Sequence, residues 1–465
     1  MYFTDLQHYM AAISSCNQLT RISVETNPLL EIAAITHRVC KQRGGGQALL
    51  FEQPAGSAFP VATNLFGSLH RTALALGVEH LEQLTSKMTA LLDLIPAIKF
   101  SGLDQQISGL PDFARFSPVS APATWNIVMK QPDLTLFPFL QSWPDDGSAS
   151  GNPRYITLPQ IFTANPDGSV PNCGMYRAQV VGARELAIRW SAGSGASRHL
   201  EKFRHQGNAM PVAIALGGPP AALFSAMFSL PGDLDEMTFA GFLRGEAIEM
   251  ADCHSSPLRV PATAEVVIEG CVDPAETCME GPFGNHTGSY SPAGPAALMR
   301  VTAISHRPDA IVPATLVGPP PMEDCWMARA WEQILLAFLK KLVPAVDDIH
   351  VPMEWIFHQS AIISLEHPQP GMVREITDKL RDLPWFAASR LLIFVDAANG
   401  IKPSQVAWHA INLADFSADL IRDESSKRLA LDATGCRGLQ RKIIQDEDVM
   451  QRVLKRWHEY GVPLK

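Results

Sequence analysis

The sequence has no concentration of positive charge, and this absence excludes several classes of partner. Its 465 residues hold 38 Lys and Arg against 47 Asp and Glu, which gives a formal net charge of −9. A nucleic-acid-binding protein normally presents a concentrated basic face, and an anionic membrane surface attracts runs of Lys and Arg. No such run occurs here. We therefore predict neither a nucleic-acid partner nor a membrane-surface partner.

Closely spaced cysteines and an unbroken apolar run are absent as well. The eight cysteines include no C-x-x-C pair, so neither a structural zinc site nor a thioredoxin motif is indicated. Residues 211–231 are uncharged, but Gly-Gly-Pro-Pro at their centre would break a membrane-spanning helix. A buried strand, a turn and a short buried helix explain this stretch better. Because the cysteines are dispersed and no signal peptide is apparent, we expect a cytoplasmic protein without an integral membrane span.

The pattern of helix-like and strand-like segments changes twice along the chain and predicts an α+β multidomain fold. Residues 1–115 alternate helix-like and strand-like segments, as in an N-terminal α/β domain. Residues 116–318 hold short β-branched runs between turn signals, which favours a barrel-like β domain. Residues 319–465 again mix helices and strands. The stretch 110–171, rich in Pro, Ser, Gly and Asp, reads as a long surface connection.

Several individual elements follow from local patterns. A helix is predicted over 29–40 and a strand over 48–52. The glycine triplet 44–46 precedes that strand, whereas a phosphate loop follows a strand, so we interpret it as structural. Residues 322–342 form an amphipathic pattern with acidic residues first and lysines last, which matches a helix dipole. The wholly apolar run in 390–397 is typical of a central strand.

A first cluster with chemical potential is PNCGMYRAQV, residues 171–180. Asn172 offers an amide oxygen beside a strand, and Arg177 follows five residues later. In a dry pocket an arginine holds a carboxylate through two parallel hydrogen bonds. The alternative is a surface arginine in a solvated ion pair, and this segment alone favours that alternative.

A second cluster is CMEGPFGNHTGSY, residues 278–290. Three glycines and a proline surround Glu280, Asn285 and His286 and predict a tight loop near a ligand. A glutamate and a histidine on one loop form a plausible acid/base set. The alternative is a turn that holds a buried, hydrogen-bonded histidine.

These clusters belong to a series of motifs that resembles the UbiD family of decarboxylases. The resemblance covers nearly the whole chain, and its strength lies in the order and spacing of the motifs. Two segments, VGPPPMED and WIFHQSAIISL, resemble the branch that includes menaquinone-pathway enzymes. The successive motifs are NCGMYR (172–177), FAGFLRGE (239–246), VPATAEVVIEG (260–270), EGPFGNHTG (280–288) and LDAT (431–434).

The resemblance implies an architecture and a set of site residues. It implies an N-terminal α/β domain, a central split β-barrel that binds prenylated FMN, and a C-terminal α/β domain used in oligomer contacts, in a dimer or a hexamer. Asn172 and Glu236 would hold a divalent metal, Mn2+ or Mg2+, on the flavin phosphate, with K+ as a further candidate. Arg177 and Glu280 would line the reaction pocket. The flavin contacts would be Met175, Tyr176, Arg177, Arg189, Trp190, Ser191 and Gly195.

The activity implied is that of a carboxy-lyase, the reversible, non-oxidative decarboxylation of an aromatic or α,β-unsaturated acid, in ubiquinone or menaquinone biosynthesis. A flavin prenyltransferase would supply the cofactor. The flavin would do the difficult chemistry, while the protein orients and polarises the substrate. Arg177 would position the carboxylate that leaves as CO2, and Glu280 would pair with Arg177.

Two positions depart from the family's pattern. Where the family carries a metal-binding histidine and a basic residue, this chain has Gly193 and Ser194, and His199 or His205 is a candidate substitute. Where relatives place a proton-donating acid, it has Asn285, whose amide has no acidic proton.

These departures leave the proton donor and the class of function open. His286 or a bound water could replace the missing acid. Gly193 favours one alternative function, a non-catalytic homologue acting as a partner subunit. A third function, an oxidoreductase that uses ordinary FMN, rests only on the resemblance of the β-barrel to flavin reductases.

Overall fold

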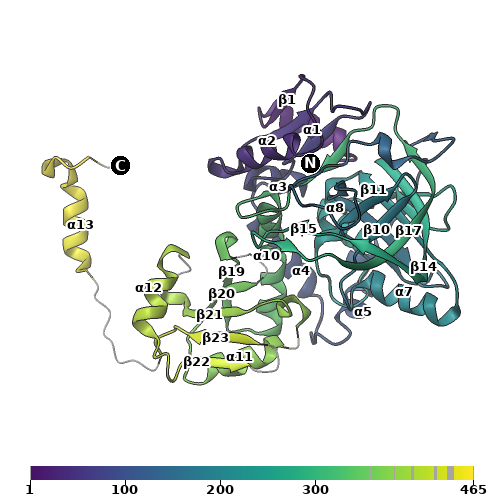
Figure 1. The fold of residues 1–465 in the computed structure, drawn as a ribbon. Coiled ribbons are helices and arrows are strands. Elements are labelled where there is room, and N and C mark those ends of the chain that lie inside the picture. The colour runs from purple at the N-terminus through teal and green to yellow at the C-terminus, as the bar shows by residue number, and fades with distance from the viewer. Residues whose placement is uncertain are drawn as a thin grey trace.

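The computed structural model describes residues 2–355, 359–381, 383–399, 403–423, 427–436 and 445–463. It shows a mixed α/β multidomain fold in which an N-terminal α/β part packs beside a central β-rich part, with a second α/β part below them (Figure 1). None of the helices in the described ranges is both long enough and apolar enough to cross a bilayer.

The N-terminal part surrounds a small mixed sheet with strand order β1-β2-β3-β18. Its fourth strand comes from a distant segment, because Val312–Ala314 pairs in parallel with Val61–Thr63. The glycine triplet lies between a helix and a strand, as predicted, and has no phosphate-loop topology. The elements are α1 (Leu6–Ser15), β1 (Leu19–Ile22), α2 (Glu31–Cys40), β2 (Ala48–Phe51), β3 (Val61–Thr63), α3 (Leu69–Ala75), α4 (Glu82–Leu92), α5 (Leu103–Ser108), α6 (Pro111–Ala114) and β18 (Val312–Ala314).

The central part is built on one large sheet with strand order β6-β9-β10-β17-β14-β11-β7-β8, which β5 joins by pairing with β17. β6 and β7 are near neighbours in sequence but lie towards opposite ends of this order, so the sheet curls around an apolar core. Within the described residues no pairing joins β6 to β8, and the predicted split barrel is therefore not confirmed. The strands are β5 (Ile127–Val128), β6 (Tyr155–Ile156), β7 (Pro159–Ala164), β8 (Pro171–Gly174), β9 (Ala178–Gly182), β10 (Glu185–Ile188), β11 (Met210–Gly217), β14 (Ala264–Glu280) and β17 (Gly294–His306).

Helices and two small sheets complete the central part. The uncharged stretch 211–231 forms a buried strand, a turn and a short buried helix, as predicted. The remaining elements are α7 (Gly195–Gln206), α8 (Pro220–Met227), α9 (Glu236–Arg244), the sheet of β4 (Val119–Ser120), β12 (Glu249–Asp252) and β13 (Arg259–Pro261), and the pair β15 (Phe283–Gly284) and β16 (Tyr290–Ser291).

The C-terminal part contains a five-stranded sheet among the described residues, with order β19-β20-β21-β23-β22. The predicted helix over 322–342 and strand over 390–397 are confirmed as α10 and β21. Helix α13 stands apart from the rest of the chain (Figure 1). The elements are α10 (Glu323–Leu342), β19 (Val346–His350), β20 (Ser360–Leu365), α11 (Met372–Arg381), β21 (Leu391–Asp396), α12 (Pro403–Leu413), β22 (Leu420–Asp423), β23 (Arg428–Asp432) and α13 (Glu447–Lys455).

One apolar core joins the parts of the chain on which the candidate site is built. It takes side chains from α1, from α8 and α9, and from residues 327–338 of α10. Phe66 of the N-terminal part packs edge-on against Phe224 of α8, and Phe228 stacks on Trp331 of α10. The N-terminal part, the central part and α10 are therefore held together by shared apolar burial.

The expectation that 110–171 is a surface connection is wrong. This stretch supplies β6 and β7 to the large sheet, and Trp125, Phe137 and Tyr155 are fully buried within it. Its prolines and glycines lie in turns between short packed segments, so the amino-acid composition of the stretch resembles that of a loop. Trp125 also donates a hydrogen bond from Nε1 to the carbonyl oxygen of Pro261, at 3.1 Å.

We predict that Trp125→Ala destabilises the protein by about 3–5 kcal/mol, because it leaves a cavity in the shared core and removes a buried hydrogen bond. Thermal unfolding followed by calorimetry would measure the change. Leu136→Ala is the matched control, since Leu136 lies in the same stretch but is 47% exposed. Equal effects of the two substitutions would contradict the packed arrangement of this stretch.

Candidate active site

The centre of the candidate site is a salt bridge between Arg177 and Glu280. Arg177 follows β8, and Glu280 ends the long strand β14, so the fold joins residues that are 103 positions apart. The guanidinium binds the carboxylate through two hydrogen bonds, Nε to Oε1 at 2.7 Å and Nη2 to Oε2 at 3.1 Å. The Glu280 side chain is fully buried, whereas that of Arg177 keeps 21% of its surface exposed. This is the bidentate geometry in which arginine binds carboxylates most strongly.

A second guanidinium binds the same carboxylate. Arg189, which follows β10, donates from Nη1 to Glu280 Oε2 at 3.3 Å and to the carbonyl oxygen of Pro292 at 2.9 Å. Two guanidiniums thus meet one buried carboxylate, and the buried Asp146 carboxylate also interacts with Arg177. Guanidinium N–H groups that Glu280 does not use make this place suited to a further anion, such as a substrate carboxylate.

Aromatic rings fix the position of Arg177. Its guanidinium carbon lies 4.6 Å from the centre of the Phe283 ring, within the range of a cation–π contact. The Tyr155 ring packs against the Phe283 ring, and the two ring centroids are 4.7 Å apart. Burial raises the pKa of Tyr155, and the nearby Glu280 raises it further. The Tyr155 hydroxyl therefore stays protonated and donates to the carbonyl oxygen of Pro282 at 3.3 Å.

Asp146 anchors the loop that follows Glu280. Its two carboxylate oxygens accept the backbone N–H groups of Gly284 at 2.8 Å, Ser142 at 3.1 Å and Trp143 at 2.8 Å. Burial raises the pKa of Asp146, while these three hydrogen bonds oppose the rise. A Cβ atom on Gly284 would lie 2.0 Å from Cδ1 of Trp143, so only glycine fits there.

Sequence reasoning missed Asp146 because its segment was interpreted as a surface connection. The available signal was an aspartate in a turn, where such side chains often accept backbone N–H groups.

The predicted catalytic residues Asn285 and His286 lie on the same loop. The Asn285 amide donates from Nδ2 to the Ser291 hydroxyl at 2.9 Å, and its Oδ1 accepts the backbone N–H of His286 at 2.8 Å. Both the nitrogen and the oxygen of this amide therefore have hydrogen-bond partners nearby in the sequence. His286 is half-buried. Their catalytic roles remain predictions.

The predicted flavin contacts come from two neighbouring links, between β8 and β9 and between β10 and α7. The backbone N–H of Met175 donates to the carbonyl oxygen of Ala226 at 2.8 Å, and the Tyr176 hydroxyl is hydrogen-bonded to the Ser194 side chain. Trp190 has a buried indole Nε1 with no hydrogen-bond partner among the residues that the structure describes. An unpaired buried donor is costly unless a ligand accepts from it. This orphaned donor fits a polar, planar ligand such as a flavin at these links.

The predicted metal ligands Asn172 and Glu236 are brought together by the backbone of β8. Glu236, the first residue of α9, accepts the N–H of Cys173 on Oε2 at 2.9 Å, directly beside Asn172. Burial raises the pKa of Glu236 to about 8. Asn172 donates from Nδ2 to the Thr163 hydroxyl at 3.3 Å, and its Oδ1 faces Gly195.

The family's three-ligand metal site is not reproduced. No group of three His, Cys, Asp or Glu residues in the described ranges is arranged to hold a metal ion. The two candidate histidines lie in different surroundings. His199 is buried and bonded through Nδ1 to the Thr163 hydroxyl at 3.0 Å, and His205 is exposed beside Glu201.

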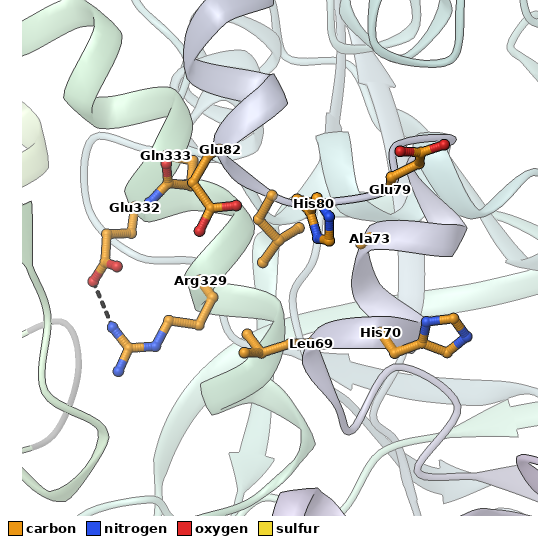
Figure 2. Close-up of a pocket in the computed structure, with 10 residues that line it drawn as sticks. Leu69, His70, Ala73, Glu79, His80, Glu82, Arg329, Glu332 and Gln333 are labelled. Atoms are coloured by element: carbon orange, nitrogen blue, oxygen red, sulfur yellow. Dashed lines mark hydrogen bonds and ion pairs between the residues drawn. The ribbon is translucent and has the colours of Figure 1, made fainter. Parts of the chain in front are cut away.

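A cavity of about 560 Å3 lies away from these residues, between the α3–α4 segment and α10. In Figure 2, His80 lies across from Arg329 and Glu332, Glu82 lies next to Gln333, and a dashed line marks the 2.7 Å ion pair of Arg329 with Glu332. Burial raises the pKa of Glu332 to about 7. No predicted site residue lines this cavity.

We predict that Asp146→Asn destabilises the protein by about 1–3 kcal/mol. One carboxylate oxygen becomes an NH2 group, which cannot accept a hydrogen bond from the backbone N–H that faces it. Hydrogen exchange at the Gly284 amide should become faster, and mass spectrometry of the corresponding peptide would measure it. Asp145→Asn is the control at the exposed neighbouring position. Unchanged exchange in the Asp146 variant would show that this carboxylate does not hold the loop.

Comparison with known proteins extends over nearly the whole chain. The chain is 34% identical over 423 residues to an uncharacterised protein of Archaeoglobus fulgidus, covering 90% of this chain and 86% of that protein. An evolved dimeric form of the UbiD-class enzyme HmfF from Pelotomaculum thermopropionicum, solved with prFMN, superposes with a TM-score of 0.80 at 26% identity over 96% of this chain and 98% of that one. The closed form of Sedimentibacter hydroxybenzoicus vanillic acid decarboxylase shares the fold, with a TM-score of 0.84 at 24% identity over the full length of both chains.

Three family domains match in the order that the motifs predict. Residues 10–90 match the N-terminal domain, 116–320 the Rift-related domain and 325–446 the C-terminal domain of 3-octaprenyl-4-hydroxybenzoate carboxy-lyase. The resemblance found in the sequence is thereby confirmed. This chain belongs to the UbiD family of carboxy-lyases.

Proposed function

We propose that this protein catalyses the reversible, non-oxidative decarboxylation of an aromatic or α,β-unsaturated carboxylic acid with prenylated FMN. The observation that carries the proposal is the buried Glu280 carboxylate held by Arg177 and Arg189, whose remaining N–H groups can bind a second carboxylate. A substrate carboxylate would accept hydrogen bonds from these N–H groups. The reaction takes up one proton and releases one CO2, so no electrons are gained or lost overall.

The protein's own residues bind and orient the reactants. Arg177 holds the substrate carboxylate, and Glu280 keeps the guanidinium in a fixed orientation. Trp190, Ser191 and the Met175–Arg177 backbone hold the flavin. When bound, the prenylated flavin supplies an electron sink for the electron pair left by the departing CO2. His286 delivers the replacing proton, since imidazole titrates near neutrality and the Asn285 amide has no acidic proton.

A decisive experiment is co-expression with a flavin prenyltransferase, followed by the visible spectrum of the purified protein and assays of CO2 release from a panel of aromatic acids. Modified-flavin absorbance together with CO2 release supports the proposal. A colourless, inactive protein would favour the partner-subunit alternative, to which Gly193 points. Plain FMN absorbance would favour an ordinary-FMN oxidoreductase.

Several finer properties belong to the same proposal. We infer a cytoplasmic location, because all eight cysteines are free thiols. We also infer a role in quinone biosynthesis, with a flavin prenyltransferase as the cofactor supplier. The substrate panel should therefore include prenylated hydroxybenzoates, and failure to release CO2 from them would remove the quinone assignment.

We predict that Arg177→Lys and Glu280→Gln each lower kcat/KM for CO2 release by at least about 100-fold, because each removes the bidentate charge pair. The flavin spectrum should remain in both variants. Arg300→Lys is the matched control, since Arg300 forms exposed ion pairs with Glu185 and Glu276. Near-normal activity in either site variant would contradict the proposed roles.

We further propose a homo-oligomer in which α13 packs on a second copy of the chain. Helix α13 has no buried residue and exposes Val449 and Leu454, while Trp408 and Ile411 on α12 are 61% and 69% exposed. An isolated helix of this length is not stable in water without a packing partner. Reciprocal exchange of α13 between two copies would cover both apolar surfaces under one two-fold axis.

Removal of residues 447–465 should convert the oligomer to a monomer in light scattering coupled to size exclusion. A milder variant, Leu454→Asp, should weaken assembly in the same direction without shortening the chain. Arg452→Asp, on the same helix, controls for the added charge. An unchanged oligomer after truncation would show that α13 is not the contact.

A further inference from the structure

The segment that begins at Glu280 is bound by two neighbouring side chains of the large sheet. Arg177, which directly precedes β9, binds the Glu280 carboxylate. Gln179 of β9 accepts the backbone N–H of the next residue, Gly281, on Oε1 at 2.9 Å. Side chains two residues apart on an extended strand point to the same side. The contact at Gly281 is therefore a second attachment directly beside the ion pair.

The amide nitrogen of Gln179 binds a third segment, residues 147–152. It donates to the Ser150 hydroxyl at 2.5 Å and to the carbonyl oxygen of Asn152 at 2.6 Å. Gln179 is fully buried, and β9 pairs at this residue with β6 on one side and with β10 on the other. The side chain therefore makes its hydrogen bonds from a backbone position that the sheet holds fixed.

The third segment also contacts the same loop through its own backbone. The N–H of Gly147 donates to the carbonyl oxygen of Pro282 at 2.8 Å, and the N–H of Ala149 donates to the carbonyl oxygen of Gly281 at 3.2 Å. A Cβ on Gly147 would lie 2.4 Å from Nε2 of Gln179, so a larger residue there would displace the amide. The Gln179 side chain thus lies where β9, this segment and the loop meet.

We infer that Gln179 is a positioning residue for the proposed reaction: it holds the loop at a fixed distance from β9 and thereby sets the orientation of Arg177 against Glu280. The inference rests on the proposed function, in which Arg177 binds the substrate carboxylate. A second, neutral attachment beside the ion pair limits the rotation of both charged side chains. Small displacements of a group that binds the reacting part of a substrate lower the rate strongly.

An amide suits this position because it accepts and donates hydrogen bonds without carrying charge. A carboxylate in its place could not donate to the carbonyl oxygen of Asn152, and it would add a negative charge to a place that already holds several ionisable groups. These groups come from the links after β8 and β10, from β6, from the loop before it and from the end of β14: Arg177, Arg189, Tyr155, Asp146 and Glu280.

The first test is Gln179→Met, which keeps about the same side-chain length and removes the three hydrogen bonds. In protein co-expressed with a flavin prenyltransferase, kcat/KM for CO2 release should fall by at least about tenfold while modified-flavin absorbance remains. Exchange of the Gly281 amide hydrogen, followed by mass spectrometry, should become faster. Gln160→Met is the matched control and should keep near-normal kcat/KM, since Gln160 is equally buried on β7 of the same sheet but bonds to the carbonyl oxygen of Gly217.

The second test, Gln179→Glu, gives a readout that a purely structural role would not move. The protonated carboxyl can donate to Asn152 as the amide does, whereas the ionised form cannot. Burial raises the pKa of such a carboxyl. The kcat/KM of this variant relative to the unmodified enzyme should therefore be highest at low pH and fall as the pH rises, over the range in which thermal unfolding shows both proteins folded. The same ratio for Gln179→Met should not depend on pH.

Three results would overturn the inference: near-normal kcat/KM in Gln179→Met, an equal loss in Gln160→Met, or a pH-independent ratio for Gln179→Glu. If Gln179→Met does not fold, the pH profile of Gln179→Glu decides. The proposed function fails separately, if the unmodified enzyme with its modified flavin releases no CO2 from any acid tested. Exchange at Gly281 then still tests the attachment, which unchanged exchange in Gln179→Met would contradict.

Discussion

The candidate site depends on one constraint: the Glu280 carboxylate is fully removed from water and must be balanced by charge from the protein. Breaking a buried ion pair costs about 3–5 kcal/mol because it leaves an uncompensated charge. Arg177 and Arg189 meet this requirement from two different links of the large sheet. The position of both guanidiniums, and hence of the N–H groups offered to a substrate, follows from where β14 places Glu280.

The surrounding structure keeps this charge cluster in place. Asp146 and Gln179 bind the backbone of the loop after Glu280 at Gly284 and Gly281 respectively. Phe283 of the same loop packs on the Arg177 guanidinium. Such support from neighbouring hydrogen bonds and packing limits the freedom of the groups that would contact substrate. The same loop carries Asn285 and His286, so the proposed proton delivery is tied to the same anchors.

Elements with a strong local pattern could be predicted from the sequence. Helix α10 followed from its amphipathic spacing and end charges, β21 from its unbroken apolar run, and the β11–α8 pair from glycines and prolines within an apolar stretch. The pairing of Arg177 with Glu280 followed only from the order of the family motifs, because neither segment alone distinguishes a buried pair from a surface one.

Features that depend on distant segments could not be predicted. The fourth strand of the N-terminal sheet comes from Val312–Ala314, and local periodicity carries no information about such a pairing. Trp125 and Asp146 lie in a stretch whose composition resembles a loop, yet the first fills the shared core and the second anchors the site. Their roles arise from contacts with Pro261 and Gly284, which lie more than one hundred residues further along the chain.

The most direct test of the central claim is a double-mutant cycle on kcat/KM for CO2 release, with Arg177→Lys, Glu280→Gln and the double variant in the flavin-loaded enzyme. If the two residues act as one charge pair, kcat/KM of the double variant will be no lower than that of the less active single variant. Losses that simply multiply in the double variant would show that Arg177 and Glu280 act independently, which would contradict this account.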